Sequence, residues 1–195
     1  MCTVIDEVTR FEPLPEFPVV DVVIYVKNAA ATIERALDSV LSQSYELTRC
    51  IVVDGASTDG TLELVTARRH ELAYFVSEPD SSACAAANKG LQRCRGDIVC
   101  FLMADDYFVP GAIAQIVEVF LETPNVAVVS SGVRVVERDA NGAERTLWET
   151  LGSDNALTVG NVLATPYSAA RYFRREALEQ LGGFREVYPY AHDRD

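Results

Sequence analysis

The feature that most constrains the fold of this chain is a regular alternation of short apolar runs with stretches of helical periodicity. Val19–Val26 is an almost unbroken apolar run rich in β-branched residues, which is typical of a strand buried on both faces of a parallel sheet. Apolar side chains then recur at helical spacing within residues 28–43. The pattern repeats, with strands predicted at 50–53, 73–76 and 97–103 and helices beginning near residues 60, 81 and 110. This alternation predicts a parallel sheet with helices on both faces.

The pattern changes after residue 122. Apolar runs at 126–131, 133–137 and 145–148, with a turn at 139–142, predict short strands that include a hairpin. A polar loop covers about 150–168, and a strand at 170–173 and a helix at 175–181 follow, closed by Gly182 and Gly183. We therefore expect a polar lead-in over residues 1–17 and a single domain over 18–195.

Composition and charge exclude several classes of protein. Of the 195 residues, 49% are hydrophobic and 9% aromatic, so the chain is not a disordered tail and is long enough for one globular domain. Acidic residues outnumber basic ones by 29 to 17, and the net charge of −12 repels polyphosphate. We therefore expect no nucleic-acid partner. A small anionic ligand stays compatible with this charge, because a bound divalent cation reverses the field locally.

The cysteines and the first residues bear on the compartment. The five cysteines are odd in number and form no CxxC pair, and four of them lie in apolar or helical stretches, which predicts reduced, mostly buried thiols. Residues 1–18 are charged and contain three prolines, in place of the apolar core of a signal peptide. No apolar run approaches the roughly 20 residues that span a bilayer. We expect a cytoplasmic protein, with contact at a membrane surface left open.

Acidic residues follow two of the predicted strands. Asp54 ends the second strand, and Asp105 and Asp106 end the fourth. Ligands of open α/β sheets bind beyond the carboxyl ends of the strands, so both places should lie at the binding edge. Two adjacent carboxylates repel each other, and a hard divalent cation relieves that repulsion. The alternative is that such acids cap turns or helices. We expect this of Asp59, whereas Asp54 has no obvious helix to cap.

Three common motifs are absent from the sequence. No GxGxxG follows the first strand, no GxxxxGK[ST] occurs, and no GxSxG is present. Their absence disfavours dinucleotide dehydrogenases, P-loop kinases and α/β-hydrolases.

The run Val52–Thr61 (VVDGASTDGT) resembles the first signature of family 2 glycosyltransferases of the GT-A fold. Further segments keep the order and spacing of that family: Ser77–Asp80, Ala86–Gly90, Arg95–Ile98, Phe101–Asp106, Pro110–Ala112, Leu181–Glu186 and Ala191–Asp195. The resemblance covers about 18–195, and the ordered set is much more specific than any single motif. It implies a Rossmann-like three-layer α/β sandwich with a mostly parallel central sheet. Residues 18–122 would form the nucleotide-binding half and 123–195 the acceptor-side half.

The same resemblance implies a reaction. The family moves a sugar from a nucleotide-diphosphate sugar to an acceptor hydroxyl, usually with inversion, and a metal-dependent member uses Mg²⁺ or Mn²⁺. The donor would be a UDP-, GDP- or dTDP-sugar. The acceptor would be a glycan or a lipid-linked molecule, in polysaccharide or glycoconjugate synthesis.

Roles for single residues follow only from their places in the matching motifs. Asp54 resembles the acid that holds the base or ribose of the donor. Asp105 and Asp106 resemble the acids that hold the ribose and the metal bridging the diphosphate. Asp193 resembles the general base that deprotonates the acceptor hydroxyl, and Asp195 is the alternative base. The other implied donor-binding residues are Asn28, Asp80, Asn88 and Lys89; for Lys89 the favoured alternative is a solvated helix face.

The chain departs from the family pattern at several positions. Tyr25–Asn28 replaces a Pro-Thr-Tyr-Asn-like stretch that touches the nucleotide, so the nucleotide stays open. Ser82 and Ala85 stand where Gly and Asp are common, and Met103 occupies the place of the first metal-site acid. Family members usually continue for some tens of residues beyond the last motif. The resemblance therefore also implies a C-terminally truncated form.

Two other functions remain open at this stage. One is a nucleotide-sugar binding domain with little or no turnover. The other is a phosphotransferase that uses Asp54 as its nucleophile. It fits less well, because Ala56 stands where that pattern has a second acid.

Overall fold

The structure, a computed structural model, describes residues 11–139, 141–150 and 170–184. Its strands are β1 (Val20–Val26), β2 (Thr48–Asp54), β3 (Tyr74–Ser77), β4 (Ile98–Met103), β5 (Val128–Ser130), β6 (Val133–Arg138), β7 (Glu144–Thr150) and β8 (Arg171–Arg174). Its helices are α1 (Ile33–Leu41), α2 (Thr61–Ala67), the short 3₁₀ helix η1 (Arg69–Glu71), α3 (Ala83–Leu91), α4 (Ala112–Glu122) and α5 (Arg175–Leu181). Every strand and helix predicted from the sequence has a counterpart here.

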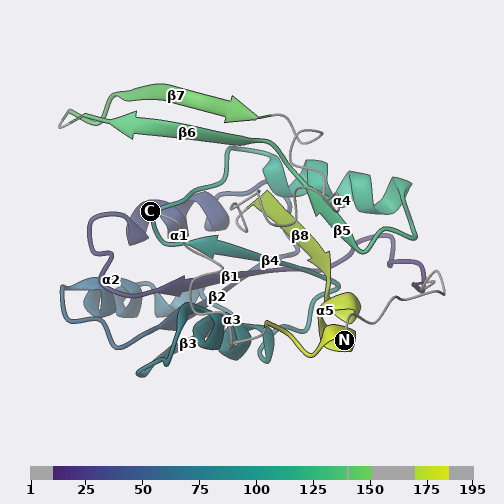
Figure 1. The fold of residues 1–195 in the computed structure, drawn as a ribbon, viewed down its shortest axis with the longest axis horizontal. Coiled ribbons are helices and arrows are strands. Elements are labelled where there is room, and N and C mark those ends of the chain that lie inside the picture. The colour runs from purple at the N-terminus through teal and green to yellow at the C-terminus, as the bar shows by residue number, and fades with distance from the viewer. Residues whose placement is uncertain (1–10, 140, 151–169, 185–195) are drawn as a thin grey trace, which may run out of the picture.

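Six strands form one sheet in the order β3-β2-β1-β4-β8-β5. Strands β1 to β4 run parallel, whereas β8 runs antiparallel to both β4 and β5. Strands β6 and β7 pair only with each other and form an antiparallel ribbon, which lies above α1 and α4 in Figure 1. The mostly parallel sheet and the separate hairpin confirm the predicted α/β architecture.

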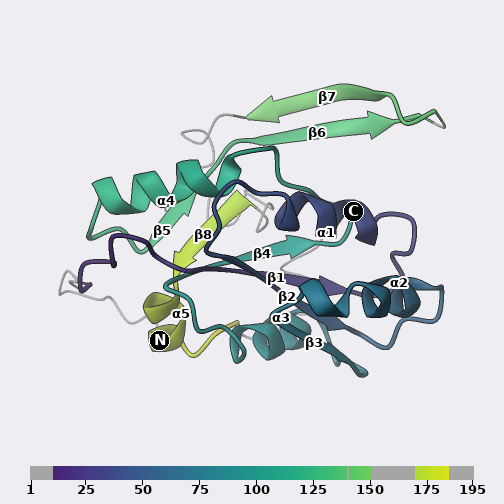
Figure 2. The ribbon, with the colours of Figure 1, turned by 180° about the vertical axis from the view of Figure 1, so that it is seen from behind.

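Helices cover both faces of the sheet and make three layers (Figures 1 and 2). One core lies between the sheet and α1, α2 and α4, and the other lies between the sheet and α3 and α5. Strand β1 faces both: Val22 and Ile24 pack into the first core and Val23 into the second, all fully buried. A central strand covered on both faces favours apolar residues on both of its sides, which explains the nearly unbroken apolar run of β1, interrupted by Asp21.

Helix α3 packs close against the sheet because its inner face carries only small residues. A β-carbon at Gly90 would lie 2.2 Å from Val23 Cγ1. Ala86 and Ala87 are also buried on this helix. A larger side chain at residue 90 would therefore push α3 away from β1.

Two helices begin later than the sequence predicted. The helix expected from residue 28 starts at Ile33, because Asn28 has a left-handed backbone (φ +53°) and a turn at Ala29–Thr32 follows it. The helix expected from Pro110 starts at Ala112, after Gly111 with φ +77°. In both places a left-handed residue cannot be part of a right-handed helix.

The Arg95–Asp97 segment lies at the amino-terminal end of β4. The buried carboxylate of Asp21 accepts hydrogen bonds from the amides of Arg95 and Gly96, both at 2.6 Å. Asp97 Oδ2 accepts one from Val19 N at 2.8 Å. This segment joins β1 to β4 at the edge opposite the acidic strand ends. Arg95 is therefore remote from that site.

Two further expectations concern the cysteines and the membrane. Cys50, Cys94 and Cys100 are buried free thiols and Cys84 is a partly exposed one. Burial raises the pKa of both Cys50 and Cys94 to about 12. Within the described ranges, no helix has the length and apolar character needed to cross a lipid bilayer.

Candidate active site

The carboxyl ends of β1, β2 and β4 meet at one edge of the sheet. Val26 of β1 lies beside Asp54 of β2, and Tyr25 lies beside Met103 of β4. The arrowheads of β1 and β4 point to the same side in Figure 1, and the turn of the β6–β7 ribbon lies on that side too. The two acidic strand ends therefore share one edge, as their sequence positions predicted.

Asp54 is fully buried, and serine hydroxyls bind its carboxylate. Oδ1 accepts a hydrogen bond from Ser57 Oγ and Oδ2 accepts one from Ser77 Oγ, both at 2.5 Å. The amide of Ser57 lies 3.3 and 3.2 Å from the same two oxygens. Asp54 therefore caps no helix, in line with the sequence, and its carboxylate instead holds the turn that follows β2. A contact between Asp54 and a donor stays a prediction.

Asn28 connects the loop after β1 to the loop after β2. Its amide donates to Ser57 Oγ at 2.8 Å, and its side-chain Oδ1 accepts from Thr58 N at 2.9 Å. The next two amides bind the same loop: Ala29 N donates to Thr61 Oγ1 at 2.9 Å and Ala30 N donates to Asp59 Oδ2 at 3.0 Å. Asn28 is exposed, so it lies at the surface of two loops that these hydrogen bonds hold together.

Asp59 has the capping role expected of it. Oδ1 accepts hydrogen bonds from the amide and the hydroxyl of Thr61, at 3.1 and 2.6 Å, at the start of α2. The hydrogen bonds from Thr61 and Ala30 lower the pKa of Asp59.

Asp80 and Lys89 form an ion pair beside the end of β2. Lys89 Nζ lies 2.6 Å from Asp80 Oδ1 and 2.8 Å from Glu78 Oε1, and it donates to Pro79 O at 3.1 Å. These acids raise the pKa of Lys89, the contact with Asp80 most. Asp80 is more than nine-tenths buried, and its Oδ2 has no hydrogen-bond partner among the described residues. Lys89 is thus occupied by acids, whereas Asp80 keeps one buried oxygen available.

Asn88 is bound on both sides of its amide group. Its Nδ2 donates to Phe184 O at 2.9 Å, and its Oδ1 accepts from Phe184 N at 2.8 Å. The residue joins α3 to the segment that follows α5 and Gly183. In this arrangement one N–H and one oxygen lone pair of the amide support the protein backbone. A contact between Asn88 and a donor stays a prediction.

Asp105 and Asp106 lie in the loop that follows β4. Asp105 is exposed and Asp106 is partly buried. Burial and the negative charge of Asp105 raise the pKa of Asp106 to about 6, and the positive charge of Arg35 opposes that shift. The pair therefore differs from Asp54, because no hydroxyl or amide of the described residues donates a hydrogen bond to its carboxylates.

The adjacent acids suit a hard divalent cation. Among the described residues no three His, Cys, Asp or Glu side chains gather into a complete metal site. Mg²⁺ is usually bound by one or two carboxylates, with the other positions taken by water and substrate phosphates. The charge repulsion at Asp105 and Asp106 is what such a cation relieves. The residues present therefore fit a metal that is completed by a bound diphosphate.

A pocket of about 840 Å³ adjoins these acids. Asp105, Asp106 and Tyr107 line it from the β4 loop, and Thr32 and Arg35 line it from the start of α1. The opposite wall is the β6–β7 ribbon, and Tyr172 of β8 also contributes.

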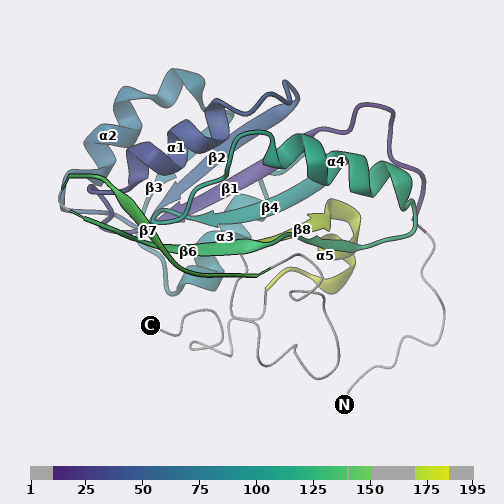
Figure 3. The same cartoon turned by 90° about the horizontal axis from the view of Figure 1, so that it is seen from above.

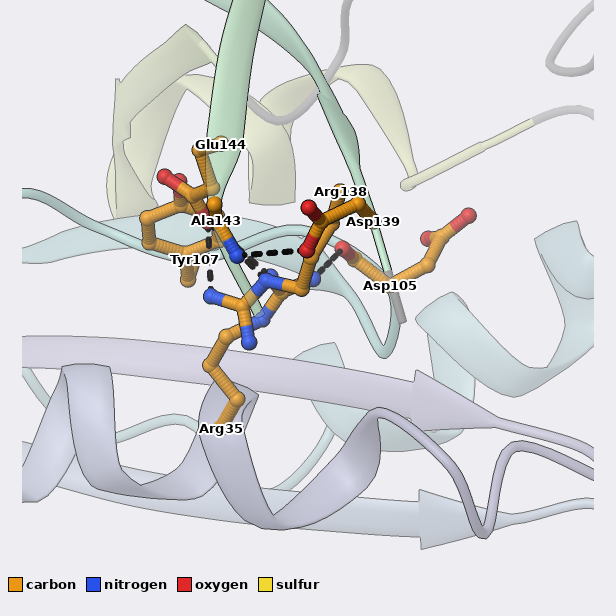
Figure 4. Close-up of polar contacts among 7 residues, drawn as sticks. All are labelled: Arg35, Asp105, Tyr107, Arg138, Asp139, Ala143 and Glu144. Atoms are coloured by element: carbon orange, nitrogen blue, oxygen red, sulfur yellow. Dashed lines mark hydrogen bonds and ion pairs between the residues drawn. The ribbon is translucent and has the colours of Figure 1, made fainter. Parts of the chain in front are cut away.

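The sequence did not indicate Arg35, Tyr107 or Glu144, which meet beside Asp105 (Figure 4). They come from α1, the β4 loop and β7. No local pattern distinguishes such residues, because their partners are up to 109 positions away.

The predicted catalytic bases Asp193 and Asp195 lie outside the described residues. The same holds for Tyr188, Tyr190 and His192, which adjoin them in the sequence. Trp148 belongs to β7 and is partly exposed on the ribbon. It is not among the residues that line the pocket.

Comparison with known proteins gives the family. The model of glycosyl transferase family 2 matches residues 21–182. The chain belongs to this family. The match includes both acidic strand ends and the ribbon, and it ends before Asp193.

Individual curated proteins are similar over most of the chain. An uncharacterised glycosyltransferase of Nostoc sp. is 28% identical over 170 residues, which cover 83% of this chain and 52% of that protein. Chondroitin synthase of Pasteurella multocida is 30% identical over 185 residues, covering 91% of this chain and 18% of the synthase. The chain thus spans about half the length of the first relative and much less of the second.

A solved structure of the same class agrees with the fold. It is the mannosyltransferase PcManGT from Pyrobaculum calidifontis in complex with GDP-Man and Mn²⁺. The TM-score is 0.64 and the identity 29%, covering 90% of this chain and 50% of that chain. The central sheet described above is therefore the GT-A fold that the sequence motifs implied.

Proposed function

We propose that this chain is the donor-binding and catalytic part of an inverting, metal-dependent glycosyltransferase that takes its sugar from a nucleotide-diphosphate donor. The observation that carries the proposal is the unneutralised acid pair Asp105–Asp106 at the carboxyl edge of a family 2 domain. An acid pair held in this state is destabilising unless a cation binds it.

Asp105 and Asp106 would hold Mg²⁺ or Mn²⁺ together with the diphosphate of the donor. When bound, the cation neutralises the charge that grows on the leaving nucleoside diphosphate. The bound GDP-Man and Mn²⁺ of the similar mannosyltransferase support this assignment. The other family 2 donors in question are UDP- and dTDP-sugars, and the nucleotide is a matter for experiment.

Asp80 is the best-placed residue for the nucleoside. Its buried Oδ2 has no partner among the described residues, and an unsatisfied buried oxygen accepts a hydrogen bond from a ligand favourably. A nucleobase N–H or a ribose hydroxyl supplies such a donor. Asp54 and Asn28 would act beside it by fixing the loop pair that borders the nucleotide.

Asp193 is the proposed general base, with Asp195 as the alternative. In a single displacement the base must take the proton of the acceptor hydroxyl on the side of the sugar carbon opposite the leaving group. The acceptor would be a glycan or a lipid-linked molecule bound by the half of the domain over 123–195. The chondroitin synthase among the relatives supports a role in polysaccharide or glycoconjugate synthesis.

The first experiment tests donor binding. Thermal unfolding is followed with UDP, GDP and dTDP, each with Mn²⁺ or with excess chelator, and Asp105→Asn is the matched control. One nucleoside diphosphate should stabilise the chain in Mn²⁺ by about 2.7 kcal/mol at a hundredfold excess over its Kd. It should not do so in chelator or in the control. Equal stabilisation with and without metal would reject the metal role.

The second experiment tests turnover. The matching nucleotide sugar is incubated with the chain, with water as the acceptor of the sugar, and release of the nucleoside diphosphate is measured for the parent and for Asp193→Asn. Loss of a general base typically costs about 10²–10⁴ in rate, while nucleotide binding should be unchanged. Binding with no turnover in the parent would instead favour a nucleotide-sugar binding domain.

A further inference from the structure

The turn end of the β6–β7 ribbon is attached to the β4 loop by four side chains. Arg35 comes from α1, Tyr107 from the β4 loop, and Arg138 and Glu144 from the two strands of the ribbon (Figure 4). We call these four residues the latch. They lie directly beside the Asp105–Asp106 pair, and none of them belongs to a motif used above.

Glu144 is the centre of the latch. Its Oε2 accepts a hydrogen bond from Tyr107 Oη at 2.8 Å. Its Oε1 accepts from Arg138 Nη2 at 2.6 Å and from Arg138 Nε at 3.2 Å, and it lies 3.5 Å from Arg35 Nη1. A single carboxylate therefore joins the ribbon to two separate elements of the main domain.

Arg35 extends this network to the acid itself. Its Nη2 donates to the main-chain carbonyl oxygen of Asp105 at 3.1 Å. Its guanidinium also lies over the Tyr107 ring, 4.4 Å from the ring centroid. The planar guanidinium can make both contacts at once, which a lysine ammonium cannot do. Arg35 thus holds the loop at the residue that carries the carboxylate and again two residues later.

The ribbon offers a defined support for these contacts. Its turn is closed by Asp139, whose Oδ1 accepts from Asn141 N at 2.8 Å and from Ala143 N at 2.9 Å. Glu144 follows this turn directly, so its backbone position is fixed.

Elsewhere the ribbon has little apolar packing. Six of the seven residues of β7 are exposed, and the pocket of about 840 Å³ lies beneath the ribbon. Figure 3 shows the ribbon extending across the domain from its connection with β5. Among the contacts between described residues, that connection and the latch are what hold it over the acids.

We propose that Arg35 and Glu144 are positioning residues, which set the place of Asp105 for its metal by holding the β4 loop against the ribbon. The inference rests on the proposed function, because it assigns a purpose to a contact with a metal-binding acid. Isolated surface ion pairs contribute little to stability. The expected purpose of the latch is therefore geometric: it orders the loop before the metal and diphosphate bind.

The test compares Arg35→Gln and Glu144→Gln with Arg145→Gln. Arg145 forms an ion pair with Glu137 at 2.6 Å on the same ribbon, and none of its described contacts reaches α1 or the β4 loop. The Mn²⁺ concentration for half-maximal thermal stabilisation is measured with saturating GDP and, separately, with UDP. The two latch variants should need about tenfold more Mn²⁺, as is typical when a partner that orients a metal ligand is lost. The control should stay within about twofold of the parent.

Amide hydrogen exchange of a peptide that covers residues 104–108 gives a second measurement, in the absence of nucleotide and metal. Exchange should be faster in both latch variants than in the parent and unchanged in Arg145→Gln. A fall in melting temperature without a change in Mn²⁺ requirement or in this exchange would overturn the latch as a positioning device. If the parent itself shows no metal-dependent stabilisation by GDP, UDP or dTDP but the exchange differs as expected, the proposed function fails while the latch still orders the loop. If neither is seen, both are wrong.

Discussion

The acids at the carboxyl ends of β2 and β4 lie at the same edge of the sheet but have opposite surroundings in the fold. Asp54 is fully buried, with hydroxyl groups of two serines bound to its carboxylate. Asp105 and Asp106 lie in a loop where their mutual repulsion is left in place. Position at the binding edge alone therefore does not define a ligand-binding acid. An acid whose oxygens already accept hydrogen bonds from protein groups supports the structure of the site. An acid whose oxygens do not can bind a ligand.

The largest effect should come from Asp54→Ala. The change removes the acceptor of the Ser57 and Ser77 hydroxyls in a buried place, and hydrogen bonds to a charged group are worth about 1.5–3 kcal/mol each. We expect a loss of about 3 kcal/mol in the free energy of unfolding, or a fall of roughly 6–12 °C in Tm. Thermal unfolding of the metal-free chain measures it, with Ser77→Ala as an intermediate control. A Tm within 2 °C of the parent value would contradict the structural role that separates Asp54 from the acids of the β4 loop.

Asp105→Asn should behave in the opposite way. The side chain is exposed, and the main-chain carbonyl that Arg35 binds is retained. We expect a Tm close to that of the parent, together with a loss of at least about 100-fold in the affinity for Mn²⁺ with a nucleoside diphosphate, since even outer partners of a metal site cost up to that much. Calorimetric titration of Mn²⁺ in the presence of the nucleotide measures the affinity. Unaltered affinity would show that Asp105 is not a metal ligand.

Asp106→Asn should stabilise the metal-free chain. The pKa of Asp106 is raised from 3.8 to about 6 in the folded state, so the folded chain binds more protons than the unfolded chain between these values. Stability therefore falls as the pH rises through that window. We expect the variant to be more stable than the parent by about 1–2 kcal/mol at pH 7.5 and equal to it near pH 4. Thermal unfolding of both proteins at both pH values measures this difference. A gain in stability that is the same at pH 4 and pH 7.5 would show that the charge of Asp106 is not its cause.

Asp59→Ala should have the smallest effect of the four. Asp59 holds Thr61 at the start of α2 and Ala30 in the turn before α1, but it lies at the surface, where water replaces lost partners. We expect a fall in Tm of about 2–4 °C, typical of a lost helix cap, with no change in the metal requirement. Comparison with Asp54→Ala by the same unfolding assay tests whether burial sets the size of the loss. Equal losses for the two variants would contradict this.

The sequence predicted most of the fold because its signals are local. The apolar run of β1, the helical stripe of α4 and the turn before β7 each depend on spacing within a few residues. The starts of α1 and α4 were misplaced, since the left-handed backbones of Asn28 and Gly111 are set by the contacts and turns around them.

The site was predicted less completely. The acids of the β4 loop and their shared edge with Asp54 follow from sequence position. The contacts of Asn88 with Phe184, of Lys89 with Asp80 and of Asp54 with Ser77 do not, because each partner comes from another part of the fold. For these residues a matching motif indicates that the residue lies near the site, but it does not indicate which group the side chain contacts.

By itself, the sequence determined the order of strands and helices, the acidic charge and the placing of acids at the ends of β2 and β4. These properties depend on residue type and on spacing along the chain. Only the tertiary structure decided which acid is bound by protein groups and which remains available. It also decided that Arg35, Tyr107 and Glu144 meet at Asp105 across separations of up to 109 residues. The physical reason is that the cost of burying a charge is set by the groups that surround it in space.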